Sequence, residues 1–449
     1  MPDKKYTGYK SSTLNWLKAN DLEVWDEIEI KKGASKLRGV ILPRNELADP
    51  RFVSIKLHTG YNIGFNPKDI QSVKKYSHFK GEYQIPKCEI IQNPELPLIP
   101  ILGCGGTIAS RLDYQTGGTI PALTPEELLS SFPEIMDLAR IETQLLFDIF
   151  SENITFAHYV EILTTIETTI KNKNPQGIVL THGTDTMAYT AAALSFAINN
   201  SPIPIVITGS QRSSDRPSSD AFFNLYNSVF YATSPQAIKG VVVIMHEGSS
   251  DTLSAIHKGT RIRKMHSSRR DTFRTIGESP MGRIADGKIQ YFSEVKKYID
   301  LSKTKRNEDL IISKKFEERI GLIYHYPGIQ PEVIEHYINT GYKGIVIAGT
   351  GLGHVSTHLV PIIRKAVDYD IIVVMTTQCL HGFTGLSVYE SGRLLKAAGV
   401  ISLNMLPETA YIKLAYLLGN FHKIDKIKEL MKTNLKGEIL QRERFQEFP

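Results

Sequence analysis

The segment that decides the fold covers residues 177–196 and reads GIVLTHGTDTMAYTAAALSF. It opens with a short apolar run at 178–180, passes through a polar loop at 181–186 and enters an alanine-rich stretch. The apolar run predicts a strand that is buried on both faces, and the alanine-rich stretch predicts a helix. A strand followed by a helix is the repeating unit of a parallel sheet, so the segment predicts a layered α/β domain.

The same alternation continues on both sides of this segment. The other apolar runs lie at 98–102, 203–207, 241–244, 320–323, 344–347 and 371–374. Between the third and the fourth of them lies a charged stretch with few apolar residues, which predicts a connection between domains. We therefore expect an α/β domain with a parallel sheet over residues 86–300, a linker at 301–318 and a smaller α/β domain over 319–449.

One helix of the first α/β domain is signalled in detail at 124–132. Thr124 can cap its N-terminus, Pro125 suits the first turn, and Glu127 can complete a capping box. These signals predict a helix soon after the first strand of the domain.

Residues 1–85 follow another pattern, because apolar and polar residues alternate in short runs such as 24–30 and 52–57. A period of two predicts antiparallel strands, and strands at this spacing predict a small all-β domain that is barrel-like, either a small antiparallel barrel or a curled sheet. The pattern shows no cluster of histidines and cysteines and no evident carboxylate pair. We therefore expect a docking unit rather than a catalytic domain.

The composition is that of a soluble globular protein, with 41% hydrophobic and 22% charged residues among 449. No apolar run approaches the ~18 residues that a membrane span needs, and the polar start of the chain lacks the apolar core of a signal peptide. The three scattered cysteines, Cys88, Cys104 and Cys379, fit reduced thiols better than disulfides. These features predict a cytoplasmic protein without a membrane partner.

The formal net charge of +6 is concentrated at the N-terminal end. Residues 1–90 hold 16 lysines and arginines against 11 aspartates and glutamates, an excess of five. Such an excess favours an anionic partner such as tRNA, but a solvated basic surface explains it equally well. The charge alone leaves both interpretations open.

Ligands of open parallel sheets bind at the carboxyl ends of the strands, so the loops after the apolar runs are candidate sites. After the run at 98–102, Gly105 and Gly106 permit a sharp turn, and Thr107 supplies a hydroxyl. Ile108 replaces the third glycine of the dinucleotide fingerprint, which disfavours a Rossmann oxidoreductase. A plain tight turn remains the alternative interpretation of this loop.

Two further segments carry candidate residues. Thr184 and Asp185 stand where a helix begins, so they fit a reactive hydroxyl beside a carboxylate, or simple N-terminal caps. His182 fits a packed residue at a strand end better than a general base. The basic segment 261–270 fits a surface or nucleic-acid patch, or a lysine, Lys264, whose protonated form is disfavoured by neighbouring cations.

The order of these loops resembles that of the bacterial-type L-asparaginases. Residues 105–109 and 182–186 match the paired signature of that family. The resemblance covers roughly residues 95–420 and extends, in the family's order, to 208–210, 348–353 and 377–379. It implies a two-domain asparaginase-like fold and the hydrolysis of a side-chain amide with release of ammonia.

The resemblance, carried over residue by residue, implies that Thr107 is the nucleophile. Thr184, Asp185 and Lys264 would form a second arrangement of threonine, aspartate and lysine. We expect Thr107 Oγ to attack the amide and form an acyl-enzyme, which water activated near Thr184 and Lys264 then hydrolyses.

Other positions concern binding and activation. Ser151 and Glu152 match the segment that holds the α-carboxylate and ammonium groups of the substrate, and backbone N–H groups after Gly183 would stabilise the oxyanion. Where these asparaginases carry an activating flap tyrosine, this chain has Thr119, and Tyr114 is out of register. Activation would therefore be controlled differently, for example by a partner.

The residues ahead of 98–102 distinguish the chain from free-standing asparaginases, which begin almost directly at the first strand. This layout, with segments 212–217 and 261–273, resembles the GatD family, the asparaginase-like subunits of the archaeal glutamyl-tRNA(Gln) amidotransferases. In that family L-glutamine is hydrolysed, and ammonia passes to a companion protein, GatE, which binds tRNA(Gln) and uses ATP. The resemblance implies a subunit of a glutamine-hydrolysing carbon–nitrogen ligase, as a homodimer within a heterotetramer.

No cofactor and no metal site is expected in this chain itself. The 13 histidines lack H-E-x-x-H or another paired spacing, and the sequence lacks G-x-x-x-x-G-K-[ST], so ATP and Mg²⁺ would bind the companion protein. Two other functions remain open. One is a stand-alone cytosolic asparaginase or glutaminase with an appended N-terminal domain, and the other is an inactive scaffold or tRNA-binding protein that kept the fold.

Overall fold

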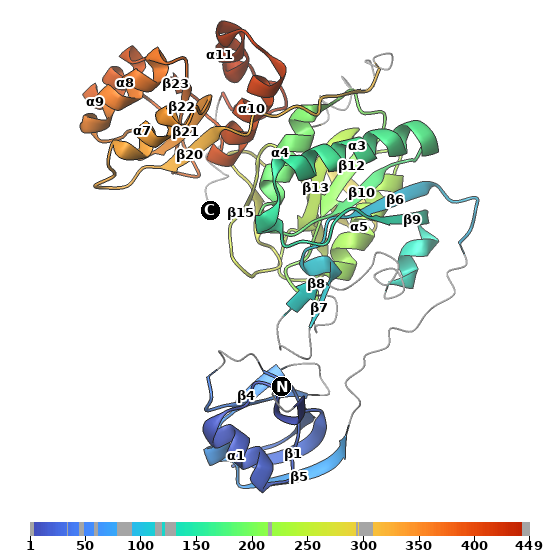
Figure 1. Ribbon diagram of the computed structural model, residues 1–449. Coiled ribbons are helices and arrows are strands. Elements are labelled where there is room, and N and C mark those ends of the chain that lie inside the picture. The colour runs from blue at the N-terminus through green and yellow to red at the C-terminus, as the bar shows by residue number, and fades with distance from the viewer. Residues whose placement is uncertain are drawn as a thin grey trace.

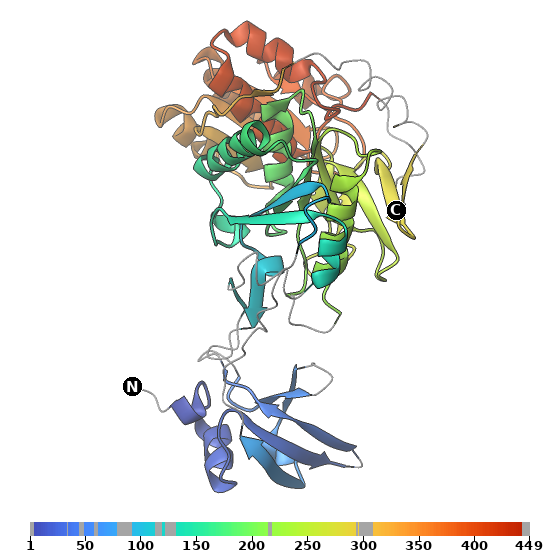
Figure 2. The same cartoon turned by 90° about the vertical axis from the view of Figure 1, so that its right-hand side faces the viewer.

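The chain forms a small β domain followed by two α/β domains in the computed structural model (Figure 1). The structure describes residues 4–33, 35–44, 49–57, 62–78, 92–112, 119–121, 132–213, 218–292, 295 and 309–441. The N-terminal and C-terminal domains lie at opposite ends of the molecule in both views (Figure 1 and Figure 2). The predicted fold class is confirmed.

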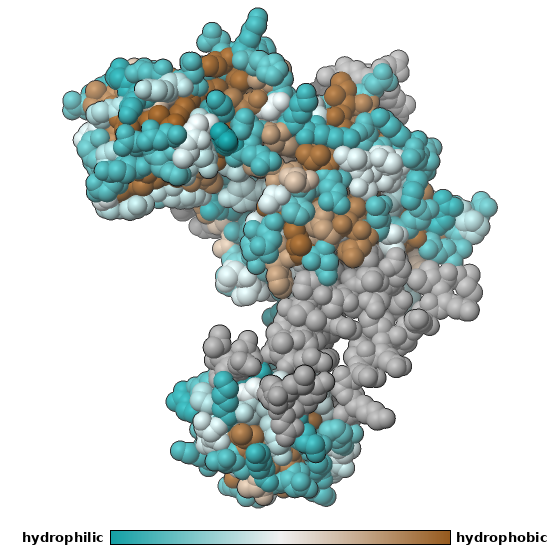
Figure 3. Space-filling model, in the orientation of Figure 1, coloured by the Kyte–Doolittle hydropathy of each residue, from teal (hydrophilic) through white to brown (hydrophobic). Residues whose placement is uncertain are grey.

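In its described part, the N-terminal domain is an antiparallel sheet covered by helix α1. Its elements are α1 Ser11–Ala19, β1 Asp26–Lys32, β2 Ser35–Ile41, β3 Val53–Leu57, β4 Asn62–Phe65 and β5 Ser72–His78. Ile28 and Ile30 alternate into the same core as Leu17 of α1, as a period of two predicts, while hydrophilic residues predominate on the visible face of the domain (Figure 3). The strand order is β4-β3-β2-β1-β5, and the predicted antiparallel all-β domain is confirmed; among the described residues β4 and β5 are its edge strands.

The central domain contains an eight-stranded sheet in the order β18-β17-β14-β13-β12-β10-β6-β9. The strands are β6 Leu98–Gly103, β9 Arg140–Leu145, β10 Ile178–Thr181, β12 Pro204–Thr208, β13 Gly240–His246, β14 Leu253–Lys258, β17 Gly282–Ala285 and β18 Lys288–Tyr291. The neighbouring strands β9, β6, β10, β12 and β13 are parallel to one another, as predicted. The strands β14, β17 and β18 each pair antiparallel with their neighbours, so the sheet is mixed.

Among the described residues, three helices cover the two faces of this sheet. They are α3 Phe156–Lys173, α4 Met187–Ala197 and α5 Ala221–Thr233. Ile178 and Leu180 of β10 pack on the face covered by α3 and α4, whereas Val179 packs on the face covered by α5. Both faces are apolar because both are buried, which explains the continuous apolar runs of the sequence.

The C-terminal domain is a smaller parallel sheet with helices on both faces. The strands β20 Ile320–Tyr324, β21 Gly344–Gly349, β22 Ile372–Thr377 and β23 Ile401–Ser402 pair in this order. The helices are α7 Glu332–Asn339, α8 Val360–Asp368, α9 Glu390–Ala397, α10 Pro407–Asn420 and α11 Ile424–Lys432. Leu414 and Leu417 of α10 share a core with Phe196 of α4, so apolar packing joins the two α/β domains.

Short pairings complete the fold. They are β7 Ser110–Leu112 with β8 Thr119–Pro121, β11 Ile198–Asn199 with β19 Ile311–Ile312, and β15 Ile262–Lys264 with β16 Phe273–Thr275. Thr119 therefore begins a strand, whereas Tyr114 and all but the last residue of the helix predicted at 124–132 lie outside the described residues. No helix in the described part of the chain combines the length and apolarity needed to cross a bilayer.

Candidate active site

Three neighbouring parallel strands deliver three loops to one edge of the large sheet. The strands β6, β10 and β12 pair in register, and their hydrogen bonds continue beyond the strand ends. The N–H of Cys104 donates to the carbonyl of Thr181, and that of His182 to the carbonyl of Thr208, each at 2.9 Å. The loops after the three strands therefore start side by side.

Glycines allow the first two loops to touch. A Cβ on Gly106 would lie 2.4 Å from Gly183 Cα, and Gly106 has a φ of +83°, so only glycine fits there. A Cβ on Gly183 would lie 2.6 Å from the Cβ of Ser151. Thr107 and Thr184 directly follow the two glycines. The structure therefore brings the backbones of both threonine loops, and that of the serine segment, to one place.

Lys264 lies between the second threonine, Thr184, and the adjacent Asp185. Lys264 Nζ lies 2.8 Å from Thr184 Oγ1 and 2.9 Å from Asp185 Oδ1. Thr184 is buried, the Lys264 side chain is 15% exposed, and the Asp185 side chain is 67% exposed. The ammonium group thus donates to a buried hydroxyl from one side, while a solvated carboxylate holds it from the other.

Arginines in and just after the basic segment form ion pairs with carboxylates. The pairs are Arg263 with Glu408, Arg270 with Asp251, and both Arg269 and Arg274 with Asp271. Hydrogen bonds from Arg269 in particular lower the pKa of Asp271 to about 2. These arginines are therefore held by carboxylates, whereas Lys264 Nζ lies against Thr184 and Asp185.

The serine segment offers a buried hydroxyl beside the threonine loops. Ser151 and Glu152 lie in the short helix η5 Ser151–Asn153, which is held in place because Thr186 Oγ1 donates to the carbonyl of Ser151 at 2.7 Å. Ser151 Oγ is buried and has no hydrogen-bond partner among the described residues, whereas Glu152 is exposed. A buried hydroxyl in this condition is suited to bind a polar ligand.

His182 is structural, in agreement with the interpretation of it as a packed residue. Its Nδ1 lies 2.6 Å from the carbonyl of Gly183, and its Nε2 lies 2.8 Å from Thr190 Oγ1. Burial lowers the pKa of His182 to about 4, so the ring is neutral at pH 7. With Nδ1–H donating to the carbonyl, the ring fixes the loop of β10 to helix α4.

A carboxylate that the sequence pattern did not single out shapes the third loop. Asp220 lies just before α5 and is fully buried. Its oxygens accept hydrogen bonds from the backbone N–H groups of Gln211 and Arg212 and from the Asn224 amide. The position of an aspartate at a helix start was the available signal, but its partners nine and eight residues earlier were not evident from the sequence.

Models of three families match the chain. Residues 22–75 match the GatD N-terminal domain, residues 98–297 the N-terminal asparaginase domain, and residues 319–431 the glutaminase/asparaginase C-terminal domain. The GatD subunit of the glutamyl-tRNA(Gln) amidotransferase of Pyrococcus furiosus is 45% identical over 94% of this chain and 96% of its own length. That of Methanosphaera stadtmanae is 43% identical over 96% and 97%. The chain belongs to the GatD family.

Solved structures similar to this GatD family member are asparaginases. The thermostable L-asparaginase from Thermococcus kodakarensis superposes with a TM-score of 0.66 and 30% identity, over 76% of this chain and 99% of its own. L-asparaginase I from Vibrio cholerae gives 0.66 and 29%, over 77% and 99%. These structures match almost in full, whereas about a quarter of this chain is additional. The resemblance expected from the sequence is confirmed, and the GatD family fits better than a stand-alone asparaginase.

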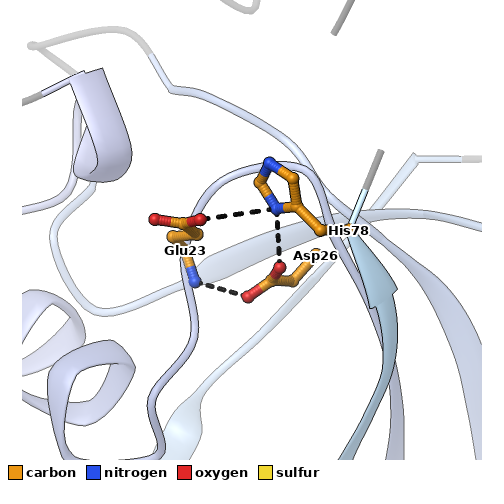
Figure 4. Close-up of side chains that lie close together, drawn as sticks. All are labelled: Glu23, Asp26 and His78. Atoms are coloured by element: carbon orange, nitrogen blue, oxygen red, sulfur yellow. Dashed lines mark hydrogen bonds and ion pairs between the residues drawn. The ribbon is translucent and has the colours of Figure 1, made fainter. Parts of the chain in front are cut away.

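The N-terminal domain of this GatD family member contains a group of side chains with metal-ligand chemistry, Glu23, Asp26 and His78 (Figure 4). His78 Nδ1 lies 2.8 Å from Asp26 Oδ1, and the N–H of Glu23 donates to Asp26 Oδ2. Lys75 pairs with Asp26 at 2.7 Å and Lys5 with Glu23 at 3.1 Å. Two ammonium groups balance the two carboxylates, and the ion pairs of Asp26 with Lys75 and His78 link β1 to β5.

Proposed function

We propose that this chain is the glutamine-hydrolysing subunit of an amidotransferase that converts Glu-tRNA(Gln) to Gln-tRNA(Gln). The observation that carries the proposal is the donation from Lys264 to the buried Thr184, next to the contact between Gly106 and Gly183. It is supported by the GatD relatives, named as glutamyl-tRNA(Gln) amidotransferase subunits, which align with the chain almost from end to end.

The reaction has two steps at this site. Thr107 Oγ attacks the side-chain amide of glutamine, the C–N bond breaks, and the nitrogen leaves as ammonia with the proton that the hydroxyl gives up. Backbone N–H groups of the Gly183 loop receive the oxyanion, and Ser151 and Glu152 hold the α-substituents. Water, oriented by Thr184 and Lys264, then cleaves the ester, releases glutamate and restores the Thr107 hydroxyl.

The ammonia passes to the companion protein GatE, which binds tRNA(Gln), ATP and Mg²⁺, so tRNA reaches this chain only through the complex. Two copies of this chain and two companions form a cytoplasmic heterotetramer. Coupling is needed because free ammonia is mostly protonated at neutral pH and is then lost to solvent. A flap with Thr119 in place of a tyrosine is consistent with a site that stays idle until the partner arrives.

The test is a glutaminase assay of the chain alone, and of the chain with its companion and charged tRNA. We expect stimulation of at least tenfold by the companion and charged tRNA, and loss of activity in Thr107→Ala. Thr164→Ala, which changes a threonine on the solvent side of α3, serves as the control and should retain activity. Full activity without the companion, or a preference for asparagine, would instead support a stand-alone asparaginase.

A further inference from the structure

A lysine-lined pocket in the C-terminal domain lies outside the candidate active site. It has a volume of about 510 Å³ and is bordered by α9, β23 and α11, which belong to the same domain (Figure 1). Its lining residues are Thr384, Gly385, Leu386, Ser387, Val388, Lys396, Gly399, Val400, Ile401, Ser402, Lys428 and Lys432. The lining holds three lysines and no carboxylate, so the pocket carries a positive charge of three.

The three ammonium groups come from two helices that are distant in sequence. Lys428 and Lys432 are four residues apart on α11 and therefore lie on the same face of the helix, where like charges repel. Lys396 lies in the last turn of α9, and its Nζ is 3.4 Å from Ser387 Oγ. Within the described residues none of the three forms an ion pair, whereas Lys426 of α11 pairs with Glu429.

Hydroxyl groups accompany the lysines. Ser402 Oγ donates to Thr384 Oγ1 at 2.7 Å, and Thr384 Oγ1 donates to Asn404 Oδ1 at 3.0 Å. These two bonds use the protons of both hydroxyl groups, whereas Ser387 Oγ accepts from the Lys396 ammonium group and keeps its own proton to donate. Three ammonium groups and the Ser387 hydroxyl suit a ligand with several negative charges and many acceptor oxygens, which describes phosphate better than a single carboxylate.

We propose that this pocket binds the phosphate groups of a polyanionic ligand. Bound phosphate would neutralise the repulsion among Lys396, Lys428 and Lys432, for which the described residues provide no ion pair. The phosphates come either from a small molecule that carries two or more of them or from the backbone of an RNA. The proposal does not depend on the glutaminase reaction, because none of the lining residues belongs to the candidate active site.

The experiment measures binding to the full chain by calorimetry at low ionic strength, with pyrophosphate and a tRNA(Gln) transcript as probes. The pocket variant combines Lys396→Gln, Lys428→Gln and Lys432→Gln. A control variant with the same change of charge combines Lys365→Gln, Lys423→Gln and Lys426→Gln, all in this domain and outside the pocket. We expect the pocket variant to bind pyrophosphate at least tenfold more weakly, and the control to stay within twofold of the parent.

The two probes distinguish the sources of phosphate. If tRNA binding also falls tenfold in the pocket variant and pyrophosphate displaces tRNA, the ligand is an RNA backbone. If tRNA binding is unchanged while pyrophosphate binding falls, the ligand is a small molecule. The proposal is overturned if neither probe binds the parent chain, or if both bind the two variants equally. Unchanged circular dichroism and glutaminase activity of the pocket variant exclude misfolding as the cause of weaker binding.

Discussion

At the scale of single residues, the site depends on side chains whose partners are far away in the sequence. Lys264 reaches Thr184 across 80 residues and Asp185 across 79. Because Asp185 is largely solvated, its ion pair with Lys264 contributes little to stability and mainly orients the ammonium group. The ion pair therefore matters because it points the Lys264 ammonium group toward the buried Thr184 hydroxyl.

Replacing Lys264 by methionine should reduce glutaminase activity with little effect on folding. The substitution keeps the length of the side chain but removes the donor to Thr184, and proton transfer groups of this kind contribute roughly 100-fold or more to a rate. We expect kcat/KM to fall at least that far in a steady-state ammonia assay. Lys288→Met, at an exposed position of β18, is the control. Activity within twofold of the parent would remove Lys264 from the mechanism.

His182 should make stability depend on pH. Its folded pKa of about 4 lies below the ordinary value of 6.5, so the unfolded chain binds the proton first as the pH falls. The contribution of the neutral ring is complete above pH 6.5 and is lost, by roughly 3 kcal/mol, between pH 6.5 and pH 4. Urea unfolding at both ends of this range should show a shallower loss in His182→Gln than in the parent. If the free energy of unfolding fell equally with pH in both proteins, the structural role of the His182 ring would be contradicted.

At the scale of elements, adjacent parallel strands decide which loops meet. The ladder of β6 with β10 aligns Gly103 with Thr181, so the loops that follow them begin at the same level. Gly106 and Gly183 then let these loops approach to backbone contact. The spacing of the two threonine loops is thus set by strand register and by the absence of two Cβ atoms.

Gly106→Ala should disrupt this contact. The added methyl group would lie 2.4 Å from Gly183 Cα, and the backbone at φ +83° disfavours any side chain. We expect a loss of about 1–3 kcal/mol in the free energy of unfolding and a severe loss of glutaminase activity. Gly248→Ala, where a new Cβ meets no atom within 4 Å, should change neither quantity. A fully active and stable Gly106→Ala protein would show that the two loops need not touch.

At the scale of the whole molecule, the segment after α11 ties the C-terminal domain to the central one. Glu438 and Lys413 are both fully buried and lie 2.5 Å apart. Arg261 donates to the carbonyl of Glu438, and Thr260 to that of Lys436. Because Arg261 lies just before β15, which carries Lys264, the end of the chain braces the strand that delivers the lysine to the site.

Glu438→Gln should destabilise the protein strongly, because it leaves the Lys413 ammonium group buried without its counter-charge. Breaking a buried pair from one side costs about 3–5 kcal/mol. The double variant Lys413→Met with Glu438→Gln should recover part of this loss, since no charge then remains buried. Thermal and urea unfolding provide the measurement, and Lys426→Gln in an exposed pair is the control. A stable single variant would mean that water already reaches Lys413.

The sequence by itself determined the fold class and the family. Apolar runs such as 178–180 report strands buried on both faces, and this signal is local, so it can be read without coordinates. The loops around Thr107 and Thr184 were recognisable for the same reason, because each motif is a short continuous stretch. The antiparallel strands β14, β17 and β18 were not predicted, because strand direction depends on the path of the connections.

Only the tertiary structure decided which charges meet. The basic segment suggested neighbouring cations around Lys264, whereas in the fold Arg263 pairs with Glu408 and Arg270 with Asp251, carboxylates that lie 145 and 19 residues away in the sequence. The pairing of Lys413 with Glu438 and the lysine pocket were likewise not predicted from the sequence. Long charged side chains pair with whatever opposite charge lies nearby in the folded structure. Charges that are far apart in the sequence become neighbours only when the strands and helices that carry them have packed.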